Sequence, residues 1–240
     1  MKVWHFSDTH SQHSKLIIPD EIDIAIFSGD CSNPRDIYQS EQEILNFLEW
    51  YSHVKIPYKI FVAGNHDVAI EKKLITNKQI ESKGLIYLEN SSVEINVNNT
   101  GLDIPPTKIK IWGSPITPTF GYGWAFNRDR DKLNKLWQNI PDDTDIVVSH
   151  GPPKTVLDLS YNVGGELEFC GCSALYKRML VVQPQLCLFG HIHNNDGVIN
   201  AGTRVVSGCE TIFSNGSVLT DGRFSYGLSS NGNVLNVNSK

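Results

Sequence analysis

The stretch that decides the fold is Tyr58-Lys-Ile-Phe-Val-Ala-Gly-Asn-His-Asp67, in which an apolar run ends abruptly in polar residues. The apolar run over residues 58–63 predicts a buried strand. Burying Asn65, His66 and Asp67 costs free energy unless these side chains find partners or ligands. Because ligands of α/β sheets bind at the carboxyl ends of strands, the pattern indicates a strand that ends in a binding site.

Four other apolar runs end in the same way. Asp8-Thr-His10 follows residues 3–6, Gly29-Asp30 follows residues 22–28, His150 follows residues 145–149, and Gly190-His191-Ile-His193 follows residues 186–189. Such an accumulation of carboxylate, imidazole and amide groups at five strand ends predicts a site for two metal ions. These ligands suit Mn, Fe, Zn or Co, and the absence of cysteine from the clusters argues against a structural zinc site.

The spacing within two of the clusters supports this prediction. Asp8-x-His10 and His191-x-His193 each place two polar side chains two residues apart. Because side chains alternate across an extended segment, both members of each pair point to the same side. A single carboxylate has two oxygens and can bridge two ions, and Asp30 is the natural candidate.

The order of predicted elements indicates an α/β fold made of one domain over residues 1–240. Strands alternate with helices in the first half, which predicts partly parallel pairing, and later strands joined by short turns predict antiparallel additions. We expect a helix that begins at Ser40 with a Ser40–Glu43 capping box, and a second helix over residues 71–83. Residues 161–171 form a predicted glycine-rich loop, and residues 203–237 a closing β-meander.

The composition excludes several classes of protein. The net charge is −5, and a protein that grips a long nucleic acid usually carries a basic face, so no such partner is expected. The five cysteines are odd in number and show no paired zinc-like spacing, which favours reduced thiols. No signal peptide precedes Asp8, and no apolar run reaches the length of a membrane span. We therefore expect a cytoplasmic protein with no membrane partner.

The clusters, taken in this order, resemble the calcineurin-like metallophosphoesterase superfamily. Further segments resemble its MPPED-type branch, the metallophosphoesterase-domain proteins related to class III cyclic nucleotide phosphodiesterases. These segments are Gly113-Ser-Pro, Gly123-Trp-Ala-Phe-Asn127, Ser149-His-Gly-Pro-Pro153, Cys172 and Phe189-Gly-His-Ile-His193. The resemblance implies a four-layer αββα sandwich of two mixed β-sheets flanked by helices, with the site at the strand ends.

The resemblance also implies a role for each residue of the clusters. One metal ion would be held by Asp8, His10, Asp30 and His193, and the other by Asp30, Asn65, His150 and His191. His66 would face the scissile phosphate and protonate the leaving oxygen, and Asp67 would orient His66 or its loop. Some animal members of the branch have Gly in place of His191, which weakens their second site, so we expect a complete dinuclear site here.

The activity implied is that of a phosphodiesterase acting on small substrates, including 2′,3′- or 3′,5′-cyclic nucleotides. A hydroxide bridging two divalent ions, with Mn²⁺ favoured over Fe, Zn or Co, would attack phosphorus. Alternatives are a phosphomonoesterase or protein phosphatase, a repair-type nuclease, and a metal-bound scaffold without turnover. The substrate partner would be a small phosphoester, with a nucleotide favoured, and the oligomeric state stays open.

Candidate substrate contacts are weaker signals. The long loop over residues 115–131 carries Tyr122, Trp124 and Phe126, which predict either a wall that stacks a base or an aromatic cover over the core. Many members of the superfamily have Asp or Asn three residues after the Asp of the Gly-Asp motif, so Asn33 fits that position and is a candidate to organise the loop. Cys31 is either a redox-sensitive thiol or a packing residue. Arg35, Arg128 and Arg130 are the nearby cations, none of them assigned.

Overall fold

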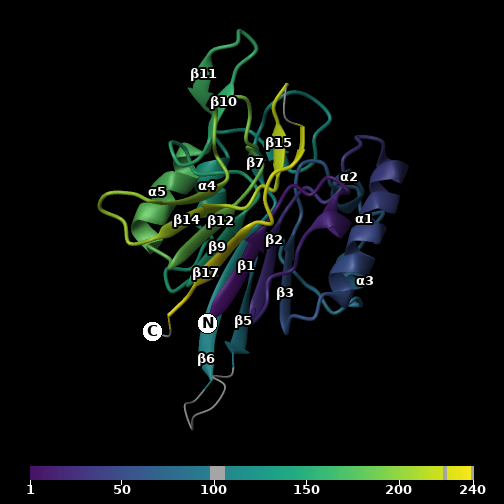
Figure 1. The fold of residues 1–240 in the computed structure, drawn as a ribbon. Helices are drawn as coiled ribbons and strands as arrows, with labels where there is room; N and C mark the ends of the chain where they lie inside the picture. The colour runs from purple at the N-terminus through teal and green to yellow at the C-terminus, as the bar shows by residue number, and fades with distance from the viewer. Residues whose placement is uncertain (98–105, 224–225, 239–240) are drawn as a thin grey trace.

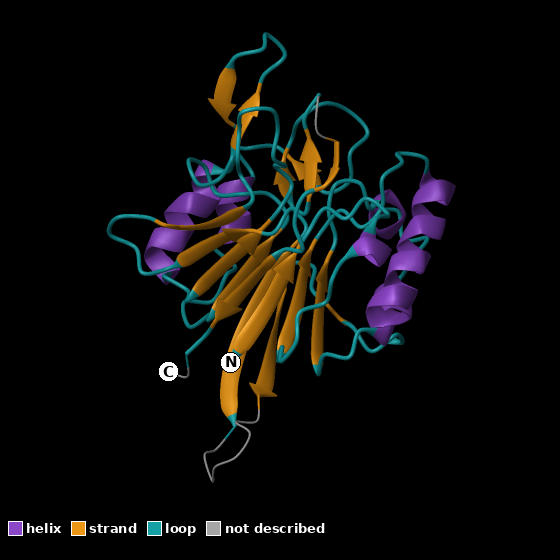
Figure 2. Ribbon diagram, viewed as in Figure 1, coloured by secondary structure: helices purple, strands orange, loops and turns teal. Residues whose placement is uncertain are grey.

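Two β-sheets lie face to face, and helices cover the outer face of each. This computed structural model describes residues 1–97, 106–223 and 226–238. In Figure 1, α1, α2 and α3 lie beside one sheet and α4 and α5 beside the other. Figure 2 shows the strands as two central layers between the purple helices. The predicted four-layer αββα sandwich is therefore confirmed.

The first sheet is mainly parallel. Its strands run in the order β17-β1-β2-β3-β4, and β1, β2, β3 and β4 pair in parallel, while β17 is antiparallel to β1. The bounds are β17 (Asn233–Asn236), β1 (Lys2–Phe6), β2 (Ile24–Ser28), β3 (Tyr58–Val62) and β4 (Ile86–Tyr87). The carboxyl ends of β1, β2 and β3 consequently meet at one edge.

The second sheet is mixed, in the order β13-β14-β12-β9-β6-β5. Strands β14, β12, β9 and β6 pair in parallel, and β13 and β5 are antiparallel additions at the two edges. The bounds are β13 (Gly202–Val205), β14 (Ile212–Asn215), β12 (Leu186–Phe189), β9 (Ile146–Ser149), β6 (Thr107–Ser114) and β5 (Ser91–Val97).

Helices and short strand pairs complete the fold. The helices are α1 (Ile37–His53), α2 (Val68–Glu71), α3 (Asn77–Glu81), α4 (Leu133–Trp137), α5 (Ser173–Val182) and the 3₁₀ turn His13–Lys15. The short pairs are β7 (Thr117–Pro118) with β8 (Asn127–Arg128), β10 (Leu159–Tyr161) with β11 (Leu167–Phe169), and β15 (Leu219–Asp221) with β16 (Tyr226–Leu228). Within the described ranges, no helix is both long and apolar enough to span a bilayer.

The alternation of side chains along the strands builds two kinds of core. In β1, Val3 points between the sheets, whereas Trp4 and Phe6 point to the helical side. The buried residues between the sheets form a cluster of Val, Ile and Leu side chains, while the outer layers contain the large aromatic rings. Strands covered on both faces are apolar throughout, which explains why their sequences look like continuous runs.

Several predicted boundaries are wrong for local reasons. Helix α1 begins at Ile37 because the Asp36 carboxylate caps it, and Ser40 lies inside the helix rather than at its N-cap. The helix predicted over residues 71–83 is two short helices, with a capping box at Thr76 restarting the second. The predicted loop 161–171 contains the turn and second strand of the β10–β11 hairpin.

The predicted β-meander at the C-terminal end is also wrong. Strand β13 pairs with β14 in the second sheet, β15 pairs with β16, and β17 crosses to the first sheet. Sequence neighbours do pair as β13–β14 and β15–β16, but these five strands belong to three different sheets rather than to one meander. Which partner each strand finds depends on the buried faces of distant segments.

Candidate metal centre

The five polar clusters of the sequence meet where the carboxyl ends of both sheets come together. Backbone hydrogen bonds join neighbouring loops within each sheet: the Asp8 N–H donates to Gly29 O in the first, and the Gly190 N–H donates to His150 O in the second. The N–H of His191, from the second sheet, donates to the carboxylate of Asp8 in the first, at 3.0 Å. Ends of strands far apart in the chain are thereby placed side by side.

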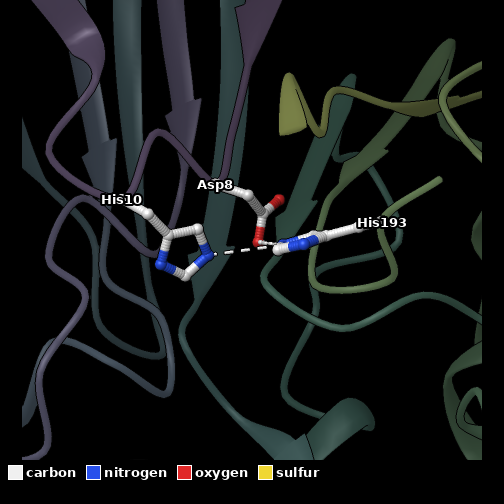
Figure 3. A group of neighbouring side chains, drawn as sticks. All are labelled: Asp8, His10 and His193. Atoms are coloured by element: carbon white, nitrogen blue, oxygen red, sulfur yellow. Dashed lines mark hydrogen bonds and ion pairs between the residues drawn. The ribbon is translucent and has the colours of Figure 1, made fainter. Parts of the chain in front are cut away.

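One cluster contains Asp8, His10 and His193, drawn in Figure 3. The Nε2 atom of His193 lies 3.2 Å from Asp8 Oδ1 and 3.3 Å from His10 Nε2. Asp8 and His10 are buried, and His193 is largely so. The three candidate ligand atoms thus converge on one point from two segments, the loop after β1 and the loop after β12.

A second cluster contains Asp30, His150 and His191, with Asn65 beside it. The Nε2 atom of His150 lies 2.8 Å from Asn65 Oδ1 and 3.3 Å from Asp30 Oδ2. The same Oδ2 atom lies 4.0 Å from His10 Nε2 in the first cluster. Asp30 therefore stands between the two groups, where a shared ligand would have to lie.

The partners of the histidine rings fit these residues to a metal ion. Nδ1 of His10 donates to Ser32 O at 3.1 Å, and Nδ1 of His150 donates to Ser28 O at 2.8 Å. A carbonyl oxygen only accepts, so Nδ1 carries the proton and the Nε2 lone pair is left for a ligand bond. Such bonds on the outer nitrogen of a histidine are the usual support of a metal ligand. The donor set suits divalent transition ions.

His193 has a stronger partner. Its Nδ1 lies 2.7 Å from the Asp221 carboxylate at the end of β15. A bridge between Thr220 and Asn194, and a hydrogen bond from the Asp221 N–H to Asn194 O, hold β15 against the loop that carries His193. Asp221 was missed in the sequence because it lies in a separate segment that shows no polar motif.

The backbone at the site is strained. Asp8, His10, Asp30 and His191 all have positive φ, at 56°, 39°, 62° and 68°. The left-handed region is unfavourable for residues with a Cβ atom, and such strain accumulates at functional sites. This feature supports a binding role, because surrounding hydrogen bonds must stabilise a conformation that the local sequence does not favour.

Glycines let the loops approach closely. A Cβ atom on Gly64 would lie 2.2 Å from Asp30 Oδ1, and one on Gly190 would lie 2.2 Å from Asp8 Oδ2. Both distances are far inside van der Waals contact. The glycines of the two motifs are therefore required by packing against the candidate ligands themselves.

Electrostatics pair each buried carboxylate with an imidazolium in the metal-free protein. Burial would lower the pKa of His193, but its bonds to Asp221 and Asp8 outweigh burial and raise the pKa to about 10. Burial likewise opposes charge on His150, yet the Asp30 carboxylate raises that pKa to about 9. Burial opposes ionisation of Asp8, but the His193 imidazolium holds its pKa at about 2.

The other two histidines stay neutral. Burial lowers the pKa of His10 to about 4 and that of His191 to about 3. Each cluster therefore offers one neutral imidazole and one imidazolium in the metal-free protein. A divalent cation would replace the protons and balance the same carboxylates.

His66 lies at the open side of the site. Its Nδ1 donates to Asn33 O at 2.6 Å, and its Nε2 lies 4.0 Å from Asp30 Oδ2. The side chain is 18% exposed, and its ring contacts the rings of His10 and Trp124. Asn33 thus contributes through its carbonyl, which fixes the orientation of His66.

Asp67 organises the loop rather than the His66 ring. Its buried carboxylate accepts from the N–H groups of Asp30, Ser32 and Gly64. Of the two roles predicted for Asp67, the structure favours support of the loop. Cys31 donates its thiol to the same carboxylate, and burial raises its pKa well above the usual value, which favours packing over redox sensitivity.

The aromatic loop places one of the three predicted rings, Trp124, and one that was not predicted, Phe120, beside the site. Trp124 packs on His66 with ring centroids 4.4 Å apart, and Phe120 packs on Trp124 at 5.7 Å and on His191 at 4.9 Å. Tyr122 is 95% exposed, and Phe126 is 1% exposed in the core. The prediction that Phe126 stacks a base is therefore wrong, since its ring has no free face, and Phe120 was missed.

Fold and site together define an α/β sandwich with a candidate site for two divalent metal ions. The chain belongs to the calcineurin-like phosphoesterase family, whose model matches residues 1–195. Asp221 lies beyond that match.

Sequence relatives agree with this assignment. Human metallophosphoesterase domain-containing protein 1 is 31% identical over 238 residues, covering 89% of this chain and 65% of the relative. A UPF0046 protein of Caenorhabditis elegans is 31% identical, covering 84% of this chain and 67% of the relative. The chain thus spans about two thirds of the length of these relatives. One solved structure at 12% identity has a TM-score of 0.59 over 89% of each chain, which shows a shared fold.

Proposed function

We propose that this protein hydrolyses small phosphodiesters with the help of two divalent metal ions. The observation that carries the proposal is the pair of donor clusters on either side of Asp30, with Nε2 of His66 facing the same carboxylate. One ion would be held by Asp8, His10, Asp30 and His193, and the other by Asp30, Asn65, His150 and His191. When bound, such a pair supplies an activated water and neutralises phosphate charge.

His66 would act on the leaving group. With Nδ1 held by the Asn33 carbonyl, a protonated ring presents its Nε2–H toward the space above Asp30. That proton would pass to the leaving oxygen as its bond to phosphorus breaks. Trp124, which packs on the same ring, limits the positions that His66 can take and shields the proton from bulk water.

The arginines near the site favour a diester over a monoester. Arg128 pairs with Glu71, and Arg130 donates to the carbonyl groups of Cys170 and Gly171. A monoester dianion carries one more negative charge than a diester and would need a further cation. Arg35, whose guanidinium lies 3.7 Å from the centroid of the Trp124 ring, is the remaining candidate.

The Phe120 ring, which is 37% exposed and packs on His191 beside the site, suits a substrate with a base. We therefore infer that 2′,3′- and 3′,5′-cyclic nucleotides are the first substrates to test, with Mn²⁺ as the first metal. The metal-stripped protein would be reloaded with Mn²⁺ and given bis-p-nitrophenyl phosphate, p-nitrophenyl phosphate and both cyclic nucleotides. Metal-dependent hydrolysis dominated by diesters is expected. Dominant monoester hydrolysis would indicate a phosphatase, and two bound ions without turnover would indicate a scaffold.

Replacing His66 separates its proposed role from metal binding. His66→Ala should lower kcat by about 10²–10⁴-fold, the usual contribution of general acid catalysis, with both ions retained. His53→Ala is the matched control, because His53 is exposed and pairs with Glu49 on α1. Unchanged turnover in His66→Ala would refute the assignment.

A further inference from the structure

A cavity of about 730 Å³ opens beside His191, and the β10–β11 hairpin forms part of its wall. Its volume falls within the range of sites that hold small molecules. Figure 1 shows this hairpin standing out from the body of the sandwich. The Tyr161 hydroxyl donates to Asp196 O at 3.3 Å, which ties the hairpin to the loop after His193.

The cavity is lined by aromatic rings from three segments: Phe120 from the loop between β7 and β8, Tyr161 from β10, and Phe169 from β11. Their exposed fractions are 37%, 44% and 48%, whereas the aromatic rings of the core are almost wholly buried. Rings that remain this exposed beside a concave surface can be covered by a ligand with a flat apolar group.

Charge does not dominate the cavity. Lys154 and Glu168 both line it and have opposite signs. Arg130 also lines it, but its guanidinium donates to the carbonyl groups of Cys170 and Gly171 and so helps to form the wall. The lining therefore carries charges of both signs, and the three aromatic rings are the apolar feature that a ligand can stack on.

The cavity lies on one particular side of the metal centre. Among the described residues, its lining includes His191 and Phe120 but neither His66 nor Trp124. His66 contacts Trp124, Trp124 contacts Phe120, and Phe120 contacts His191, so these four rings form a chain across the site. A group in the cavity would extend from His191, at one end of this row of four rings, away from the proton donor His66 at the other end.

We propose that the cavity holds an aromatic or heteroaromatic group on the ester that stays attached to phosphorus. This inference rests on the proposed function and narrows its substrate class. In the reaction, the oxygen of water bonds to phosphorus, and the ester bond beside His66 breaks. The leaving oxygen takes the proton of His66, and a proton from the attacking water then returns to His66. The ester bond beside His191 stays intact.

The proposal distinguishes diesters from monoesters by geometry. A monoester has only the leaving group, which is placed at His66, so it gains nothing from the cavity. A diester has a second group, and the cavity gives that group a place. In a cyclic nucleotide both ester oxygens belong to one sugar, and the base is the part that would enter the cavity.

The test uses substrates with one leaving group, p-nitrophenolate, and a variable retained group. The Mn²⁺-loaded protein would be given methyl p-nitrophenyl phosphate and phenyl p-nitrophenyl phosphate. We expect a lower KM for the phenyl ester. Phe169→Ala should raise that KM about tenfold, the upper range of an aromatic contact, and leave the methyl ester within about twofold. Its effect should fall on KM rather than kcat, because the retained group binds alike in ground and transition states.

Leu180→Ala is the control. Leu180 lies on α5, is 38% exposed, and is outside both the cavity lining and the hairpin. It should change neither KM. Equal KM values for the two esters in the wild type, or equal effects of Phe169→Ala on both, would overturn the proposal.

Binding without turnover separates this inference from the proposed function. Calorimetry would compare diphenyl phosphate with dimethyl phosphate on the same Mn²⁺-loaded protein and variants. If neither p-nitrophenyl diester is hydrolysed, the proposed function fails, but tighter binding of diphenyl phosphate that Phe169→Ala removes would still support the cavity. Hydrolysis of the diesters with no preference for phenyl groups in either assay would overturn the cavity alone.

Discussion

Asp221 offers a sharp test of how the metal centre is supported. Its carboxylate lies 2.7 Å from His193 Nδ1, on the side of the ring away from the candidate metal position. The carboxylate fixes the ring orientation and increases the electron density at Nε2. Asp221→Asn retains an oxygen that can accept the Nδ1–H but removes the charge.

The structure sets the expected magnitude. Loss of such a partner typically weakens metal binding 10–100-fold. Because the Asp221 side chain is 49% exposed, water screens part of its charge, and the lower end of that range applies to Asp221→Asn. We expect about a tenfold loss of affinity, equivalent to ~1.4 kcal/mol. Asp221→Ala also removes the hydrogen bond, so its loss should approach the upper end, about a hundredfold.

The assay is competition for Mn²⁺ with a chelating indicator, followed by a count of bound ions. Only the ion at Asp8, His10 and His193 should weaken, so one ion should be lost before the other. Asp196→Asn is the control, because that carboxylate accepts the Arg223 N–H in the adjoining segment. Wild-type affinity in Asp221→Asn, or an equal loss in Asp196→Asn, would refute the reasoning.

Three further predictions concern the same centre. Asp30→Ala should prevent stable binding of both ions, because the Asp30 carboxylate lies between the two clusters. Metal analysis after gel filtration would check this, and two retained ions would contradict the prediction. Metal uptake at pH 7 should release about two protons, since the His150 and His193 imidazolium groups must lose them, and metal affinity should rise with pH up to about 10. Calorimetry in buffers of different ionisation enthalpy measures that release, and a release near zero would be the contrary result. Gly64→Ala should displace Asp30 and abolish metal binding. Gly84 has open space around it and a φ of +74°, so Gly84→Ala should cost about 1–2 kcal/mol of unfolding free energy but keep the metals. Metal loss in both variants, or in neither, would contradict the packing argument.

The sequence predicted that these side chains would meet at one candidate centre, because they follow the strands directly. Asp8 and His10 come after β1, and His191 and His193 after β12, so a local signal marks each of them. Apolar runs reveal strands buried on both faces, and polar residues at their ends reveal a site. The same logic predicted an α/β fold with mixed strand pairing, and the resemblance supplied the four-layer sandwich and the assignment of each ligand.

Features that depend on contacts between distant segments were not predictable. Asp221 meets His193 only because β15 packs on the adjoining loop. In the loop over residues 115–131, Phe120 faces the site and Phe126 enters the core, although both look alike in the sequence. An irregular loop has no fixed period that would indicate which side chains point inward.

The sequence by itself determined the strands, the donor groups and the kind of ion they suit, since these depend on local hydrophobicity and on ligand chemistry. Only the tertiary structure decided the supporting contacts: the orientation of His66 by Asn33, the partner of His193 and the cavity beside His191. Those contacts are set by long-range packing, in which small differences in burial decide which groups come within bonding distance. The chemistry is therefore local in the chain, and its precision comes from the fold.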